Sequence, residues 1–225
     1  KAVSLSIDRD VIVNKIRNFN ETIAWSLVPK GVLNYEYSGL IKEKNLTQEE
    51  RNGIATEILR SRGYTDKNPL KFTIKYRNGG DQKKHMVAIQ SMLKKANIEV
   101  ILEASEPKVL YSYLRTGDFQ VGDAGWIADY NDASNFLFLF QSSSGPLNYG
   151  KYSNFNFDQL MVNAQNEIDI SKRTIILKKA EKILMEDMPL APILFGISRS
   201  LVKENISGWE ENSSASHGSR YLKRN

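Results

Sequence analysis

The chain has 225 residues, of which 41% are hydrophobic and 25% are charged, an ordinary composition for a globular protein with a sizeable core. It contains no cysteine, which excludes disulfide bonds, Cys-ligated zinc and thiol nucleophiles. No apolar run approaches the length of a membrane span, and the opening residues carry no signal-peptide pattern.

The formal net charge of +5 would suit a nucleic acid or an anionic surface. The basic residues are dispersed, however. Pairs such as Lys83 and Lys84, or Lys178 and Lys179, alternate with acidic residues along predicted helices and loops. Such a pattern is typical of solvated helix faces. We therefore expect no nucleic-acid partner, and a basic interaction module is only a minor alternative.

The first third of the chain predicts helices separated by a long irregular segment. Residues 2–7 and 8–17 read as two short helical stretches, and Asp8 is placed to cap the second. Residues 18–45 lack a regular pattern. Thr47-x-x-Glu50 is a capping box, and it opens a helix that we expect to reach Arg62 and end at Gly63.

Strands and helices alternate through the middle of the chain. The strands are expected at 70–76, 98–103 and 119–124, and the helices between them at 81–96 and 107–116. This is the order of βαβ units with right-handed crossovers. It predicts an α/β fold, in which a layer of mixed sheet is flanked by helices.

The last third predicts mainly helices and a loose end. A short apolar helix is expected at 133–140, a turn-rich loop at 142–152, and longer helices at 155–167 and 171–187. Asp169 or Ser171 would cap the last of them. Residues 190–202 read as extended, and residues 208–225 as a loose tail.

The segment 117–141 (GDFQVGDAGWIADYNDASNFLFLFQ) is the strongest candidate for a site. A strand ends there in a loop rich in polar and aromatic residues, and α/β proteins usually bind ligands at such strand ends. The alternative is purely structural: Trp126 is then a core aromatic residue, and Asp132 caps the following helix.

Catalytic and metal chemistry find little support. The only histidines, His85 and His217, have no nucleophile beside them in sequence, and neither a GxSxG nor an HExxH motif occurs. The residues from Asp129 to Asp132 resemble the opening of an EF-hand, but the obligatory glycine is missing. No second carboxylate at a defined spacing suggests a glycosidase. We expect no enzyme activity, no cofactor and no metal.

The sequence GDFQVGDAGWIADYNDASNFLFLF resembles the GWxADYxDPxxFL segment of the periplasmic oligopeptide-binding proteins of ABC transporters, which are family 5 extracellular solute-binding proteins. Four further stretches match in the same order: SLSIDRDVIV, YSNFNFDQLM, AEKILMEDMPLAPILF, and GW followed by HGSRYL. The resemblance covers essentially the whole chain. It implies a lobe of the type II periplasmic-binding-protein fold.

The resemblance also implies roles for single residues. Asp129 matches the aspartate that forms a salt bridge with the α-amino group of the peptide, and a buried charged bond of this kind is far stronger than a surface ion pair. The backbone of the preceding three residues would hydrogen-bond the ligand. The candidate ligand-binding residues are Asp129, Trp126, Ile127, Ala128, Tyr130, Asn131 and Arg115.

Arg115 is included among these candidates because the sequence departs from the family pattern. Some members carry arginines that meet the peptide carboxylate, but Leu114 and Asp123 occupy those places here, and Arg115 lies one step away. The carboxylate partner and the preferred peptide length therefore stay open.

By the same resemblance, residues 1–188 are expected to form the C-terminal ligand-binding lobe of a longer periplasmic protein. Residues 189–225 would return to its N-terminal lobe, and this lobe and the signal peptide would be absent from the chain. The implied partners are a peptide and the permease of an ABC importer. A dipeptide, a murein peptide, haem or a nickel chelate is an alternative ligand, although two histidines make haem or nickel ligation less favoured.

Overall fold

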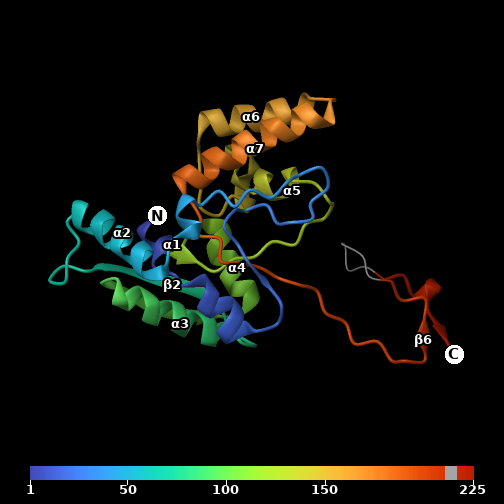
Figure 1. The fold of residues 1–225 in the computed structure, drawn as a ribbon, viewed down its shortest axis with the longest axis horizontal. Helices are drawn as coiled ribbons and strands as arrows, with labels where there is room; N and C mark the ends of the chain where they lie inside the picture. Colours follow the sequence, from blue (N-terminus) through green and yellow to red (C-terminus); the bar gives the residue numbers. More distant parts are fainter. Residues whose placement is uncertain (211–216) are drawn as a thin grey trace.

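The computed structural model describes residues 1–210 and 217–225. Figure 1 shows a sheet with its helices in the lower part of the molecule and the helix pair α6 (Phe155–Asn166) and α7 (Ile170–Asp187) above it. Among the described residues, no helix is long and apolar enough to cross a membrane.

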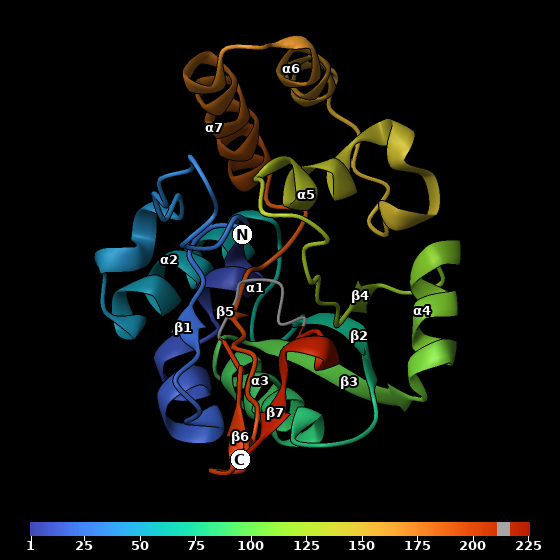
Figure 2. The same cartoon turned by 90° about the vertical axis from the view of Figure 1, so that its right-hand side faces the viewer.

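The main sheet is formed by β2 (Leu70–Arg77), β3 (Ile98–Ser105) and β4 (Val121–Gly122) in the order β3-β2-β4. Both pairings are parallel, so the expected mixed sheet is wrong for this layer. The crossovers are α3 (Gln82–Lys95) and α4 (Pro107–Thr116), which is the predicted βαβ order. Figure 2 shows α3 below the sheet and α4 at its side.

The third strand is shorter than the expected 119–124. Only Val121 and Gly122 pair with β2. The side-chain oxygen of Gln120 accepts the backbone N–H of Thr73 at 2.8 Å, which takes the place of a backbone ladder bond. A side chain at position 122 would collide with Leu114, so α4 packs closely against this strand.

The N-terminal helices form largely where predicted. The expected helix 2–7 is α1 (Ala2–Leu5), and the stretch 8–17 contains the π-helical η1 (Val11–Arg17), with Asp8 accepting the N–H of Val11 at 3.1 Å. The capping box of Thr47 and Glu50 is present at the start of α2 (Gln48–Ser61).

The remaining described elements are short, apart from α6 and α7. The cap of α7 is Asp169, whose carboxylate accepts the N–H of Lys172 at 2.9 Å. The expected helix 133–140 is α5 (Ser134–Leu137) followed by η3 (Phe138–Phe140). The others are η2 (Lys42–Asn45), η4 (Ser142–Leu147) and η5 (Ser219–Tyr221).

Two buried clusters form the core. The first lies between the sheet, α1, α2 and α3 and includes Leu5, Leu93 and Ile98. The second lies under α5, α6 and α7 and includes Leu137 and Phe157. Partly buried Leu27 and Leu190 pack against both clusters. Burial of this much apolar surface is the main driving force for the fold.

Residues from the two ends of the chain meet in the lower part of the molecule. β1 (Thr22–Ile23) pairs antiparallel with β5 (Leu194–Phe195). Close by, the fully buried guanidinium of Arg9 donates to the carbonyl of Pro192 at 2.8 Å. The late segment is therefore part of the same body as the first residues.

After β5 the chain leaves this body, as the red segment at the right of Figure 1 shows. It ends in a two-stranded antiparallel pair, β6 (Ile206–Ser207) with β7 (Lys223–Arg224). The expected extended run 190–202 has regular pairing only at β5. The expected loose tail 208–225 contains β7 and η5, while residues 211–216 lie outside the described part.

Candidate functional site

The candidate site is the loop of residues 123–133, which leaves the carboxyl edge of the parallel sheet after β4. Asp123 still donates its backbone N–H to the carbonyl of Lys75 at 2.8 Å, so the loop starts from a fixed point. Its other end is the start of α5. The edge where parallel strands end is the usual ligand position in α/β folds.

Asn135 holds the first half of the loop from within. It is almost fully buried, and its side-chain oxygen accepts both the indole N–H of Trp126 at 2.7 Å and the backbone N–H of Asp129 at 3.3 Å. The ring of Trp126 also packs edge-on against Phe138, with centroids 5.7 Å apart. The turn that presents residues 126–129 is thus fixed by one buried amide.

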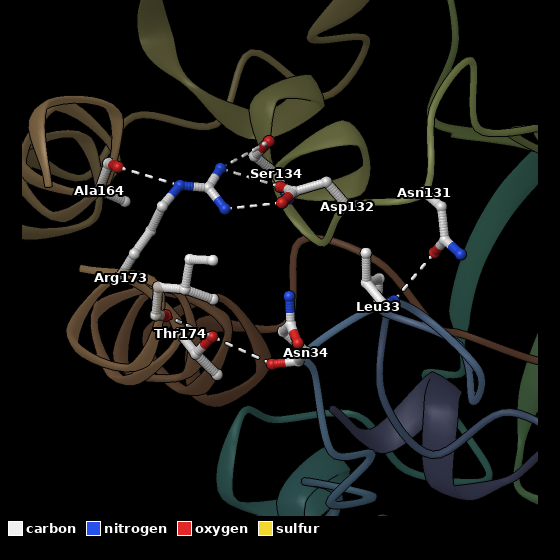
Figure 3. A network of polar contacts seen from close by, with 9 residues as sticks. Leu33, Asn34, Asn131, Asp132, Ser134, Ala164, Arg173 and Thr174 are labelled. Atoms are coloured by element: carbon white, nitrogen blue, oxygen red, sulfur yellow. Dashed lines mark hydrogen bonds and ion pairs between the residues drawn. The ribbon is translucent and has the colours of Figure 1, made fainter. Parts of the chain in front are cut away.

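Arg173 of α7 holds the second half. Its guanidinium donates to both carboxylate oxygens of Asp132, at 2.6 and 2.9 Å, and to the carbonyl of Ala164 at 3.2 Å (Figure 3). Partial burial raises the pKa of Asp132, but the hydrogen bonds from Arg173 and Ser134 outweigh it, and the net pKa lies below its usual value. Asp132 also accepts the backbone N–H of Ser134, the first residue of α5, at 2.8 Å, although the N-cap position of this helix is Ala133.

A second loop supports the site from the side. The amide oxygen of Asn131 accepts the backbone N–H of Leu33 at 2.9 Å (Figure 3). The segment around Leu33 is itself tied to α7, because buried Glu181 accepts the N–H of Val28 at 2.7 Å and the hydroxyl of Tyr35 at 2.6 Å. Burial raises the pKa of Glu181, and these two hydrogen bonds oppose the rise.

Between these supports, several side chains point to solvent. Ile127 is 88% exposed and Tyr130 is 56% exposed. Asp129 is exposed, and its carboxylate has no hydrogen bond or ion pair within residues 1–210 and 217–225. The backbone N–H and C=O groups of Ile127 and Ala128 likewise bond to no other described residue. A rigid loop therefore presents one free carboxylate beside free backbone groups and an aromatic ring.

The structure does not bring Arg115 to this loop. Arg115 is exposed in the last turn of α4, where its charge acts on Tyr149. Leu114 is buried against the sheet. Asp123 accepts a hydrogen bond from the amide of Gln82 at 2.7 Å. The grouping of the remaining candidates, Trp126 to Asn131, follows from their adjacency in the sequence.

Two residues of the site escaped sequence reasoning. Asn135 follows the loop directly, and an amide between apolar neighbours on a buried helix face is a signal that could have identified it. Arg173 lies 41 residues from Asp132, and no local pattern pairs them. Nowhere in the described ranges does a group of three or more His, Asp or Glu residues come together as a metal site.

Comparison with known proteins shows that the chain is similar to extracellular solute-binding proteins of bacteria. Residues 1–148 match the family model for bacterial extracellular solute-binding proteins, family 5 Middle. The chain therefore belongs to this family.

Curated relatives agree along nearly the whole chain. It is 34% identical over 223 residues to the periplasmic oligopeptide-binding protein OppA of Haemophilus influenzae, a match that covers 96% of the chain and 40% of the relative. It is 32% identical to the periplasmic murein peptide-binding protein MppA of Escherichia coli, over 94% of the chain and 39% of the relative. The chain thus spans about two-fifths of the length of these relatives.

Solved structures share the fold. The Escherichia coli murein tripeptide-binding protein MppA superposes with a TM-score of 0.90 at 32% identity, over 99% of this chain and 44% of the other. The complex of Haemophilus influenzae OppA with the peptide RPPGFSPFR gives a TM-score of 0.89 at 32% identity, with the same coverage. The α/β lobe of a periplasmic binding protein, which the sequence predicted, is confirmed.

Proposed function

We propose that this chain is the lobe of a solute-binding protein that captures peptides, and that Asp129 anchors the peptide α-amino group. The observation that carries the proposal is the free, exposed carboxylate of Asp129 on a loop that Asn135 and Arg173 hold from both sides. An ammonium group is its natural partner, and enclosure on binding would strengthen the pair well beyond a surface ion pair.

The rest of the loop supports a peptide in particular. The unpaired N–H and C=O groups of Ile127 and Ala128 can pair with peptide amides, as in strand addition. Such bonds do not depend on the side chains of the ligand. Trp126, Tyr130 and Asn131 would border the first residues of the peptide.

The organisation of the whole protein is part of the proposal. Residues 1–188 form the lobe, and residues 189–225 return to a second lobe outside this chain after β5 has fixed them to the first. Closure of both lobes around the peptide would exclude water, and delivery to an ABC permease would follow in the periplasm. The protein would act by binding, without enzyme activity.

A murein peptide is the second candidate ligand. The relatives named OppA and MppA match this chain at nearly equal identity, 34% and 32%, and their names specify oligopeptides and murein peptide respectively. Either kind of ligand has a free α-amino group when its first residue is unmodified. The pairing of this group with Asp129 can therefore be tested separately from the preferred ligand length.

The test is calorimetry on the whole protein, with a pool of di- to pentapeptides and, separately, a murein tripeptide. Asp129→Asn keeps the shape of the side chain and removes its charge, and Asp10→Asn, on an exposed helix face, is the matched control. We expect Asp129→Asn to weaken peptide binding by about 3–5 kcal/mol. We expect N-acetylation of the peptide to have the same effect on the unchanged protein. Equal affinity of Asp129→Asn and Asp10→Asn would refute the anchor.

A further inference from the structure

The tripeptide Arg-Asn-Gly occurs twice in the chain, at residues 51–53 and at residues 77–79. An asparagine before a glycine can lose its side-chain amide when the backbone nitrogen of the glycine attacks the side-chain carbonyl carbon. The reaction is favoured there because glycine has no side chain to hinder the approach and adopts many backbone conformations. Two identical sequences in two different structures allow the effect of the structure to be separated from that of the sequence.

The first copy lies within a helix. Asn52 and Gly53 belong to α2 (Gln48–Ser61), and helical hydrogen bonding joins the N–H of Gly53 to the carbonyl four residues earlier. The side-chain oxygen of Asn52 accepts the amide N–H of Gln48 at 2.8 Å. The nitrogen of Gly53 therefore cannot turn toward the side chain of Asn52 unless the helix opens locally.

The second copy lies in an exposed turn. Asn78 directly follows β2, and Gly79 and Gly80 continue the turn toward α3. Gly79 has a φ of 110° and open space where a side chain would be. Within residues 1–210 and 217–225 its N–H donates no hydrogen bond. The attacking nitrogen is thus free, and it belongs to a residue with few conformational limits.

Asn78 itself is held from the side away from Gly79. Its backbone N–H donates to the carbonyl of Ser105 at 2.7 Å, and its side-chain NH2 group donates to Glu106 at 2.8 Å. Its side-chain oxygen accepts no hydrogen bond from another described residue. Only the glycine turn has to move for the two reacting atoms to meet, and small displacements of this kind control the rate of such reactions.

We propose that Asn78 is a site of spontaneous deamidation in the folded protein, and that the helix protects Asn52. The nitrogen of Gly79 gives its proton to solvent and bonds to the side-chain carbonyl carbon of Asn78. The bond from this carbon to the side-chain nitrogen then breaks, and ammonia leaves with a proton from solvent. Water opens the resulting succinimide ring and yields aspartate or isoaspartate. The net reaction consumes water and releases ammonia, and it is independent of the proposed peptide binding.

The modification would weaken the connection between β2 and α4. Glu106 is the N-cap residue of α4, and it accepts a hydrogen bond from the amide of Asn78. Deamidation replaces this donor by a second carboxylate, and two like charges at this separation repel each other. In isoaspartate the backbone is also longer by a carbon atom directly after the bond to Ser105.

The first experiment compares the two copies in the same molecule. The whole protein is incubated in mildly alkaline buffer, with a parallel sample in urea, and peptide mapping by mass spectrometry measures aspartate and isoaspartate at both positions. In urea both asparagines should react at similar rates. In the folded protein Asn78 should react roughly ten- to a hundredfold faster than Asn52. Asn78→Gln, whose extra methylene disfavours the five-membered ring, should abolish the reaction at this position and leave Asn52 unchanged.

The second experiment tests the consequence. Asn78→Asp imitates one product, and Asn163→Asp adds the same charge on an exposed face of α6. At neutral pH Asn78→Asp should have the lower melting temperature of the two. The difference should shrink as the pH falls and the carboxylates become protonated. Equal melting temperatures at neutral pH would overturn the repulsion assigned to Glu106.

Two outcomes of the first experiment would overturn the site itself. One is an equal rate at Asn78 and Asn52 in the folded protein. The other is an unmodified Asn78 in the folded protein after a time in which the sample in urea has reacted.

Discussion

Arg173 donates hydrogen bonds to both carboxylate oxygens of Asp132 and so connects helix α7 to the loop that carries the candidate site. The pair is partly exposed, with 27% of each side chain accessible. Its contribution to the free energy of unfolding is therefore moderate, and its main effect is to fix the position of the loop.

Replacement of Asp132 by Asn should lower the free energy of unfolding by about 1 kcal/mol at neutral pH, the upper range for an ion pair of this exposure. The pKa of Asp132 is lowered in the folded state, so its contribution is complete above the ordinary value of 3.8 and is lost as the pH falls through the lower folded value. Urea unfolding at pH 7 and pH 3 should show the difference shrinking in acid.

Asp118→Asn is the control for this pair, because Asp118 is 68% exposed and lies 3.4 Å from Lys75. It should change stability by less than about 0.5 kcal/mol at either pH. A difference between Asp132→Asn and the unchanged protein that grows in acid would contradict the assigned direction of the pKa.

For Glu181 we expect stability to depend on pH in the opposite direction. Burial raises its pKa in the fold, so the folded state favours the protonated form, and stability is lost as the pH rises through the raised value. Glu181→Gln removes this titration, keeps an oxygen that accepts the N–H of Val28, and replaces the other acceptor by an NH2 group that can donate to the hydroxyl oxygen of Tyr35. The variant should therefore gain stability relative to the unchanged protein as the pH rises above the ordinary value of 4.5, as thermal unfolding would measure. Parallel curves, like those expected for the exposed Glu186→Gln, would argue against it.

Arg9 is buried, and among residues 1–210 and 217–225 no carboxylate pairs with it. Its guanidinium donates to the carbonyls of Ser4 and Pro192, both at 2.8 Å, and lies 4.7 Å from the ring centroid of Trp25. Burial lowers its pKa to about 10. Arg9→Met should cost about 3 kcal/mol, because it leaves buried carbonyls without donors. Denaturant unfolding would measure the loss, and Lys15→Met on an exposed helix face should be nearly neutral.

Asn135 makes a prediction about the site itself. Asn135→Leu keeps the volume but leaves the N–H groups of Trp126 and Asp129 without an acceptor, which should reduce stability by about 1–3 kcal/mol. Peptide affinity of the whole protein should fall as well, because the turn that presents Asp129 is released. Asn166→Ala removes an exposed side-chain hydrogen bond within α6 and should have a smaller effect on both quantities. Equal effects would mean that Asn135 does not position the loop.

Structural features that depend on residues close together in the sequence were predicted correctly. The capping box of Thr47 and Glu50 forms as predicted, and of the two cap candidates for α7, Asp169 and Ser171, the structure shows Asp169; both caps involve residues three apart. The βαβ order also holds, because strand and helix periodicities can be read over short windows. The loop of residues 123–133 was chosen as the candidate site because of its resemblance to a family and its position after a strand.

Contacts between distant residues were not predictable in this way. Arg173 and Asp132, or Glu181 and Val28, are brought together only by the packing of α7. The length of β4 was overestimated because the side chain of Gln120 replaces a backbone bond, which propensity does not register. The parallel order of the sheet follows from both crossovers being helical, and the expectation of a mixed sheet overlooked this.

The pairing of β1 with β5 has a consequence for how the molecule is made. Residues 22–23 pair with residues 194–195, and Arg9 donates a hydrogen bond to the carbonyl of Pro192. During synthesis, residues 9 and 22–23 therefore lack these partners until residues 192–195 have been made. The βαβ units, whose contacts are local, can fold before that. Closure of this long-range pair would be the late step, and the early segment would be the part most exposed to aggregation or to a chaperone until then.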